Sequence, residues 1–215
     1  MKKYIFTFVA LMVVLIAAAQ SSNESKVILD RAYAAYSASD GVKLSFSLAV
    51  QEDAKGRGQS SETGEAMAKG NKFKIETNTA DIWYDGTTQW VLSKDAKEVY
   101  VSQPSGDELA TVSPLALLSL YKKGYAFKAP VSKTVNGRPA YVIDMEATDK
   151  KGDFTSIAVA IDKQSNSILQ VILVMRNGMK NKIDIERYNA NYRFADQDFI
   201  FDKAAHKGVE IVDLR

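Results

Sequence analysis

Hydrophobic and polar residues alternate with a period of two along most of the chain after residue 41. Leu44, Phe46, Leu48 and Val50 alternate with polar or small residues, a pattern typical of a strand with one buried face. Similar short segments follow at even spacing, which predicts an antiparallel meander that curls. The strands are expected over 42–50, 64–68, 72–77, 81–84, 88–93, 98–102, 125–128, 131–134, 140–147, 154–162, 167–176 and 180–191.

Turn residues separate these segments. Asp85-Gly86, Asn136-Gly137 and Asn177-Gly178 are dipeptides typical of tight hairpins, and the strands on either side of Asn177 form the strongest hairpin in the chain. The polar stretch 51–63 is predicted to be a long hairpin connection. Residues 199–211 are expected to form a last extended run.

Two segments have helical signals instead. In 23–37, Val27, Ile28, Ala32, Ala35 and Tyr36 form one apolar stripe at helical spacing, and Asp40-Gly41 ends the segment. The simplest interpretation is a helix packed on a sheet, and the alternative is a helix across the mouth of a cavity. A second helix is predicted over 115–123, with a Ser-Pro start and Gly124 as its stop. It is apolar nearly all round, so it must bury more than one side.

The first nineteen residues have the organisation of a secretory signal peptide. Lys2 and Lys3 form a positive start, residues 4–16 are apolar, and three alanines at 17–19 make a small-residue cleavage site. The alternative, an uncleaved anchor, fits the short apolar run less well. Residues 20–215 are then expected to form a single domain, exported across the inner membrane and soluble in the periplasm.

Composition and charge argue against several classes of function. The chain has no cysteine, so a lipid-anchored mature protein, disulfides and thiolate chemistry are not expected. It has 28 basic and 26 acidic residues, and removal of Lys2 and Lys3 leaves equal numbers. Near-zero net charge argues against nucleic acid, whose binding depends on phosphate neutralisation. A monomer is expected.

Residues with catalytic chemistry are sparse. His206 is the single histidine and is interpreted as an exposed loop residue. No phosphate-binding loop or serine nucleophile motif is present. Asp85 is explained by its turn, Asp81 by the start of a strand, and Asp144 by the solvent-exposed face of another strand. We expect no enzyme activity, no cofactor and no metal; a cleft hydrolase with paired carboxylates remains the alternative.

Several segments together resemble the outer-membrane lipoprotein carrier family, the LolA-like proteins. The resemblance extends over nearly the whole chain after the signal, and its most specific part is an Asp-Gly-x-x-x-Trp element followed by a Pro-Leu helix. The segments are Gly64-Glu65-Ala66, Lys69-Gly70-Asn71-Lys72-Phe73, Tyr84-Asp85-Gly86-Thr87-Thr88-Gln89-Trp90, Val99-Tyr100-Val101, Ser113-Pro114-Leu115-Ala116-Leu117-Leu118, Phe199-Ile200-Phe201 and Gly208-Val209-Glu210.

The resemblance implies a mainly β protein, an open (half) antiparallel β-barrel whose helices form a lid over an apolar concavity. It also implies a periplasmic carrier that binds the acyl chains of lipoproteins released from the inner membrane and delivers them to the outer membrane. Each acyl CH₂ brought into water costs about 0.8 kcal/mol, so such cargo needs a carrier. The implied partners are acylated lipoproteins, an inner-membrane ABC transporter and, where one exists, an outer-membrane acceptor.

The implied ligand-binding residues are apolar side chains of the sheet and of the second helix. The family pattern has an Arg-Pro near a strand turn, where this chain has Lys69-Gly70-Asn71. In the family this arginine helps to couple lid opening to lipoprotein transfer, so the resemblance implies that role for Lys69. The alternative is that Lys69 is an exposed turn lysine. The expected acyl-chain cavity is lined by Phe46, Phe73, Ile75, Ile82, Trp83, Trp90, Val99, Val101, Leu115, Leu117, Leu118, Val171 and Leu173.

A different cargo is the second hypothesis for the same shape. A half-barrel of this kind also suits a periplasmic lipid-binding protein or an envelope-stress sensor that binds partner proteins. Co-purified acylated protein would favour the carrier, and bare lipid would favour the alternative.

Overall fold

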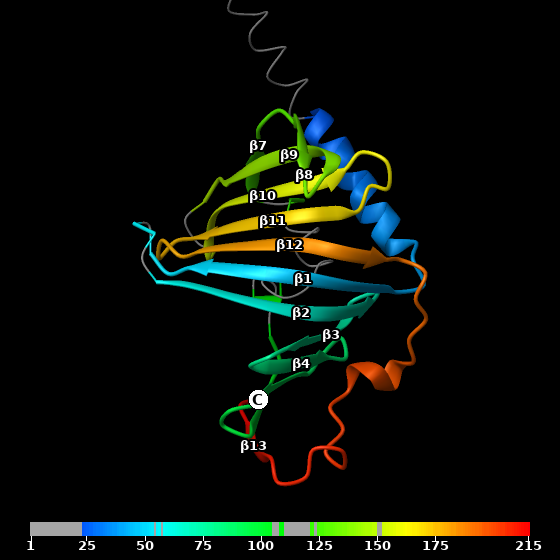
Figure 1. Cartoon of the computed structure of the whole chain (residues 1–215), viewed down its shortest axis with the longest axis vertical. Coiled ribbons are helices and arrows are strands. Elements are labelled where there is room, and N and C mark those ends of the chain that lie inside the picture. The colour runs from blue at the N-terminus through cyan, green and yellow to red at the C-terminus, as the bar shows by residue number, and fades with distance from the viewer. Residues whose placement is uncertain are drawn as a thin grey trace, which may run out of the picture.

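A strongly curved sheet with the helix 23–37 across one face dominates the protein (Figure 1). The computed structural model describes residues 23–53, 55–56, 58–104, 108–109, 121–122, 124–149 and 152–215. The strands are β1 (Val42–Gln51), β2 (Gln59–Lys69), β3 (Lys72–Thr77), β4 (Ala80–Tyr84), β5 (Gln89–Ser93), β6 (Glu98–Ser102), β7 (Tyr125–Phe127), β8 (Val131–Val135), β9 (Arg138–Ala147), β10 (Phe154–Asp162), β11 (Ile168–Met175), β12 (Lys180–Asn189) and β13 (Glu210–Asp213), with a 3₁₀ turn η1 (Asp196–Phe199).

The strand order is β13-β6-β5-β4-β3-β2-β1-β12-β11-β10-β9-β7, and β8 also pairs with β9. All neighbours are antiparallel except β13, which lies parallel to β6. In the described part of the chain the two edge strands, β13 and β7, do not pair with each other. The sheet is therefore an open half-barrel, as predicted.

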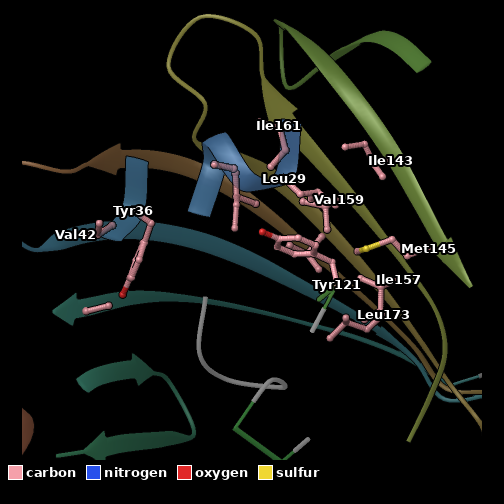
Figure 2. Packing of buried hydrophobic residues seen from close by; sticks show 14 of the residues in the cluster. Leu29, Tyr36, Val42, Tyr121, Ile143, Met145, Ile157, Val159, Ile161 and Leu173 are labelled. Atoms are coloured by element: carbon pink, nitrogen blue, oxygen red, sulfur yellow. The ribbon is translucent and has the colours of Figure 1, made fainter. Parts of the chain in front are cut away.

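Two faces of the sheet are defined by strands β1 to β6, which pair without any interruption of register. Successive side chains point to opposite faces. The inner face carries Leu44, Ala66 and Phe73, which belong to one buried cluster with helix residues Ile28 and Leu29. The outer face carries the residues in between. Figure 2 shows labelled side chains of β9, β10 and β11, such as Met145, Val159 and Leu173, on the same side of the sheet as the helix residue Leu29.

The predicted helix 23–37 is confirmed, but its buried stripe differs from the expectation at three positions, because Val27 and Ala35 are exposed and Leu29 is buried. Ile28, Leu29, Ala32 and Tyr36 are buried, whereas Val27 is 45% exposed and the predicted contact of Ala35 is also wrong, since it lies on the solvent side. Residues 28, 29, 32 and 36 have the i, i+3 and i, i+4 spacings of a single helix face.

Two predicted segments are wrong in detail. Residues 51–63 are not one long connection, because β1 continues to Gln51 and β2 begins at Gln59, with Ser47 still paired to Thr63. Backbone hydrogen bonds extend this hairpin where side chains are polar. Residues 199–211 are not one extended run, because η1 and a series of turns precede β13. The second predicted helix, 115–123, lies outside the described residues except for Tyr121 and Lys122.

Candidate ligand-binding face

The inner face retains accessible apolar surface beside the part that the helix covers. Ile75 pairs with Ile82, and Ile82 pairs with Val91, so three aliphatic side chains lie in one row across β3, β4 and β5. Phe46 and Ile185 form a similar pair across β1 and β12. All five are only half-buried. This strip of aliphatic and aromatic surface is the candidate site.

Gly64 makes room for the aromatic member of this strip. It lies opposite Phe46 in the β1–β2 ladder. A Cβ atom at position 64 would lie 2.7 Å from Phe46 Cζ and 2.6 Å from the backbone oxygen of Glu76. Both distances are shorter than a carbon side chain tolerates, so glycine allows the Phe46 ring to lie against the backbone of β2.

The helix 23–37 is anchored at both ends. Near its start, the Ser25 hydroxyl donates a hydrogen bond to the Lys128 carbonyl at 2.7 Å, just after β7. Near its end, the Tyr36 hydroxyl donates to the Gly70 carbonyl at 3.4 Å, in the β2–β3 turn. Burial, with a smaller effect of nearby Tyr188, raises the pKa of Tyr36, so this hydroxyl remains a donor. The helix thus spans the inner face between two distant parts of the sheet.

A second group of contacts ties the helix to the segment that leads into β7. The Tyr121 hydroxyl donates a hydrogen bond to Asp30, and the Lys122 ammonium lies 3.7 Å from the centre of the Tyr33 ring. Lys26 also contacts Asp30, at 2.7 Å. The hydrogen bonds from Lys26 and then Tyr121 lower the pKa of the Asp30 carboxyl. We call this contact the Asp30–Tyr121 clasp.

The predicted site residues divide into three groups. Six lie on the helix-covered side of the sheet, three lie outside the described residues, and four lie on the opposite face. The first group is Phe46, Phe73, Ile75, Ile82, Val171 and Leu173, and the second is Leu115, Leu117 and Leu118.

The prediction that Trp83, Trp90, Val99 and Val101 line the same hollow is wrong. Trp83 pairs with Trp90, and Trp90 pairs with Val101, so these side chains share the outer face. They form a separate cluster with Leu92, Phe201 and Val209, which come from β5 and the C-terminal segment. The physical reason is that β4 to β6 are apolar on both faces, and only alternation with Ile82 and Tyr84 assigns each residue to its side.

His206 belongs to this outer cluster and is not an exposed loop residue. Its ring is half-buried, with its centre 5.5 Å from that of Trp83 and 4.8 Å from that of Phe201. The Nδ1 atom lies 2.8 Å from the Asp202 carbonyl, so this nitrogen is the donor. The single histidine therefore packs the C-terminal segment against the sheet.

Lys69 also lies on the outer face, away from the helix. Its ammonium donates to the Phe194 carbonyl at 3.0 Å and contacts Asp196 at 3.4 Å, and Lys72 contacts the same carboxylate at 2.9 Å. The predicted lid coupling by Lys69 therefore has no contact in the described structure to support it. The link between the helix and the β2–β3 turn is made by Tyr36 and Gly70 instead.

Several inner-face residues were not predicted as site residues from the sequence. Leu44, Val91, Ile183 and Ile185 lie in the same face as the predicted Phe46 and Ile82. A stricter use of period-two alternation from Ile82 finds Val91 once the hairpin register is known. The contribution of β12 has no local signal, because its pairing with β1 joins distant parts of the chain.

The acidic residues that might support hydrolysis have structural roles. Asp85 accepts hydrogen bonds from the backbone of Thr87 and Thr88, at 2.9 and 2.8 Å, as its turn predicts. Asp81 pairs with Lys94 at 2.8 Å. Asp144 is solvent-exposed, also as predicted. None of these pairs two carboxylates across a cleft.

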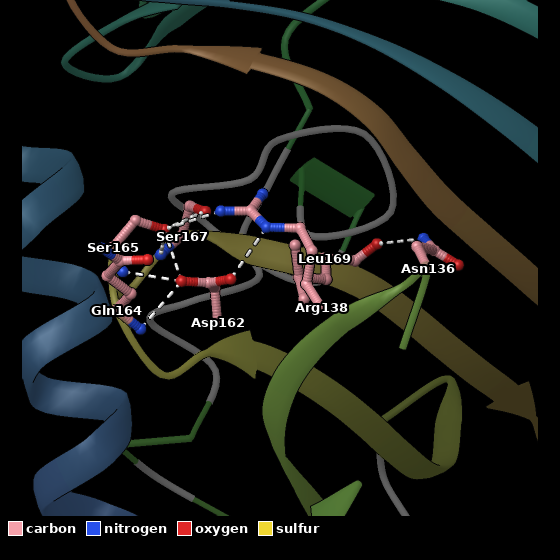
Figure 3. A network of polar contacts seen from close by, with 7 residues as sticks. All are labelled: Asn136, Arg138, Asp162, Gln164, Ser165, Ser167 and Leu169. Atoms are coloured by element: carbon pink, nitrogen blue, oxygen red, sulfur yellow. Dashed lines mark hydrogen bonds and ion pairs between the residues drawn. The ribbon is translucent and has the colours of Figure 1, made fainter. Parts of the chain in front are cut away.

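A polar network at the β10–β11 hairpin surrounds the buried Asp162 (Figure 3). The carboxylate accepts hydrogen bonds from the backbone of Gln164 and Ser165 at 2.9 and 2.7 Å, and Arg138 contacts it at 2.9 Å. Burial opposes ionisation, but these hydrogen bonds prevail and lower the pKa of Asp162. The network fixes a turn.

An outer-face pocket of about 420 Å³ lies between β2–β4 and the C-terminal segment. Lys74, Arg193 and Asp198 are among its lining residues. Each charge has a partner within the protein: Lys74 contacts Glu76 at 2.7 Å, Arg193 contacts Asp40 at 3.4 Å, and Asp198 accepts from the backbone of Ala195 at 2.9 Å.

Within the part of the chain that the structure describes, no group of three or more acidic or histidine side chains is placed to hold a metal ion. None of the helices described is both long enough and apolar enough to cross a bilayer.

The geometry defines a class of protein, an open antiparallel half-barrel with a helix across its inner face. The profile of the family described as "Outer membrane lipoprotein carrier protein LolA" matches residues 15–179, more than half of the chain. The chain belongs to this family. No curated protein is significantly similar to it in sequence.

Two of the similar solved structures share the fold. An uncharacterized conserved protein from Thermus thermophilus has a TM-score of 0.54 and 10% identity, covering 88% of this chain and 99% of that one. A DUF1329 family protein from Desulfovibrio piger has a TM-score of 0.50 and 11% identity, covering 86% and 99%. A LolA superfamily protein from Nitrosomonas europaea has a TM-score of 0.44 and 10% identity, covering 82% and 97%.

Proposed function

We propose that this protein is a periplasmic carrier for the acyl chains of lipoproteins. It would receive them from an inner-membrane ABC transporter and deliver them towards the outer membrane, without catalysing a reaction. Membership of the lipoprotein carrier family supports this function. The observation that carries it is the half-buried apolar strip on the inner face, which includes Phe46, Ile75 and Ile82.

The energetics favour reversible binding of an acyl chain. Each acyl CH₂ shielded from water contributes about 0.8 kcal/mol, so even partial cover of a long chain gives useful affinity. The strip lies beside a helix whose ends are fixed by single hydrogen bonds, from Ser25 and Tyr36. Hydrogen bonds of this kind contribute only about 0.5–1.5 kcal/mol each. A shift of the helix that exposes buried Ile28 and Leu29 costs about 1.5–3 kcal/mol more for each side chain, and the burial of one long acyl chain can offset this cost.

The alternative is a half-barrel that binds a free lipid or senses envelope stress. It uses the same inner face and differs in its cargo. Native mass spectrometry of the protein purified from its own periplasm distinguishes the two, since the carrier retains acylated protein and the alternative retains lipid alone. Depletion of a carrier also leaves outer-membrane lipoproteins in the inner membrane, whereas normal sorting favours the alternative.

The site itself is tested by Ile82→Glu. A carboxylate in the half-buried row should weaken binding of an N-palmitoylated peptide by at least about tenfold, because its desolvation is unfavourable. Fluorescence polarisation measures the affinity, and the same peptide without the acyl chain is the blank.

The matched control is Thr63→Glu, which introduces the same charge at an exposed outer-face position of β2. It should leave the affinity unchanged. Equal binding by the two folded variants would exclude the inner face as the acyl site.

A further inference from the structure

The inner face of strands β1 to β6 has no basic side chain. Its charged residues are Glu62 in β2 and Glu98 in β6, and every other inward position is apolar or neutral. The ladders from β1 to β6 have no register shift, so alternation along each strand assigns every residue to one face of the sheet. The four lysines of these strands, Lys43, Lys69, Lys72 and Lys74, are all on the outer face.

The two inner carboxylates lie towards one end of the strands, beyond the aliphatic row of Ile75, Ile82 and Val91. The Glu62 carboxylate accepts hydrogen bonds from the Thr79 hydroxyl at 2.8 Å and the Thr79 backbone at 3.0 Å. Burial acts to raise its pKa, but these hydrogen bonds outweigh that effect and lower it. Glu62 is therefore negative at neutral pH, and its field opposes the entry of another anion.

At the other end of the aliphatic row lies a row of neutral polar side chains. Tyr84 pairs with Gln89 and Gln89 pairs with Ser102, so the three residues lie in one row across β4, β5 and β6 on the inner face. The Ser102 hydroxyl donates to the Gln89 side-chain oxygen at 3.4 Å. Gln89 and Ser102 are half-buried and Tyr84 is 6% exposed. Hydroxyl and amide groups of this kind can donate to ester or amide carbonyls.

We infer that the inner face selects acyl chains joined through an uncharged ester or amide, and rejects free fatty-acid anions and other lipids whose charged group would enter with the chain. The chain lies along the aliphatic row, and its carbonyl end meets the neutral row of Tyr84, Gln89 and Ser102. This inference rests on the proposed acyl-binding function and names the chemical class of its ligand. Burial of an anion without a cationic partner is costly, and the inner face of β1 to β6 offers none.

A pair of ligands with the same chain tests the selection. Isothermal titration calorimetry at pH 7.5 compares 1-monolauroyl glycerol, a neutral ester, with laurate, both below their micellar concentrations. We expect the ester to bind at least about tenfold more tightly. Laurate that binds as tightly as the ester overturns the inference but leaves the carrier function standing. If neither ligand binds, the proposed function fails together with the inference.

Gln89→Lys adds the missing cation. It should shift the ratio of the two affinities towards laurate by at least about fivefold, because the carboxylate gains an ion pair. Gln59→Lys is the matched control, because Gln59 is exposed on the outer face of β2, and it should change neither affinity. Circular dichroism verifies that both variants are folded. A folded Gln89→Lys protein with an unchanged ratio of the two affinities contradicts the inference.

Discussion

The inner and outer faces of β1 to β6 are made from alternate residues of the same strands, yet they have opposite chemistry. The inner face is apolar or neutral apart from two glutamates, and part of it is left half-buried. The outer face carries lysines paired with acids, such as Lys74 with Glu76 at 2.7 Å, and a closed aromatic cluster around Trp83. The outer cluster is thus completed by the protein's own C-terminal segment, while the inner side keeps half-buried apolar surface.

This difference means that the outer cluster can be changed separately from the candidate binding surface. In most small domains a single hydrophobic core both holds the sheet together and borders the binding site. Here the Trp83 cluster is held by Phe201, with ring centres 5.4 Å apart, on the side away from the candidate site. Variants of the outer cluster should therefore have little effect on ligand binding, whereas inner-face variants can change both stability and binding, because the inner face also holds the larger buried cluster under the helix.

The largest expected effect is that of Trp83→Ala. Removal of this buried indole should lower the free energy of unfolding by about 3–5 kcal/mol, because Phe201 and His206 lose their common contact. Urea unfolding measures the loss. Hydrogen exchange should also accelerate at Leu214, whose amide donates to the Val101 carbonyl at 2.8 Å. Binding of the palmitoylated peptide should persist under folding conditions; its loss would show that the two faces are coupled. Trp83→Phe, which keeps a ring, is the control.

Gly64→Ala should have the next largest effect, on the inner side. The added methyl group would meet Phe46 Cζ at 2.7 Å and a backbone oxygen at 2.6 Å. Such overpacking costs about 1–3 kcal/mol, and displacement of the Phe46 ring should weaken acyl binding as well. Thermal unfolding and peptide affinity check both effects. A double variant with Phe46→Leu should recover part of the stability; no recovery would mean that the backbone contact dominates.

Tyr121→Phe removes one donor from the Asp30–Tyr121 clasp. We expect a loss of about 1 kcal/mol at pH 7, limited by solvent because the Asp30 side chain is 45% exposed.

The clasp also gives a pH dependence with a defined sign. The pKa of Asp30 is lowered in the folded protein from its ordinary 3.8. The stabilisation that ionised Asp30 gives the folded state is therefore fully present above this ordinary pKa, and it is lost as the pH falls through the lower pKa of the folded protein. Denaturant unfolding between pH 5 and 2 should show less acid sensitivity in Tyr121→Phe than in wild type. Tyr33→Phe, which keeps the ring beside Lys122, should retain it. Identical pH profiles for wild type and Tyr121→Phe would contradict the role of this clasp.

The smallest expected effect is that of Lys69→Ala. The Lys69–Asp196 pair is largely solvent-exposed, and surface pairs of this kind contribute little. Peptide affinity and release rate should stay within about twofold of wild type. A large change in release, measured by stopped-flow fluorescence, would restore the coupling role that the sequence resemblance suggests.

The positions of most strands follow from local signals. Asn177-Gly178, for example, predicts a hairpin, and β11 and β12 end and begin at Met175 and Lys180. Turn residues and alternation act over a few neighbours, so one sequence is enough to find them. The extension of β2 to Gln59 was missed because its polar side chains lack alternation, although its backbone groups pair fully with β1.

The candidate site was only half predictable for a related reason. Ile82 and Trp83 are both large and apolar, so composition alone cannot say which of them faces the ligand. The decision comes from Phe201 and His206, which lie far along the chain and cover the Trp83 side. Such long-range packing leaves no local pattern.

The pairing of β1 with β12 has a consequence for how the protein acquires its shape. This ladder joins two meanders, β2 to β6 and β9 to β12, whose internal hairpins are local and can form early. The joining step brings together segments from opposite ends of the chain, which carries a larger entropy cost and is slower. We therefore expect the pair of Phe46 and Ile185 to complete the inner face only when the two halves join, whereas the aliphatic row of Ile75, Ile82 and Val91 lies within one half and can form earlier.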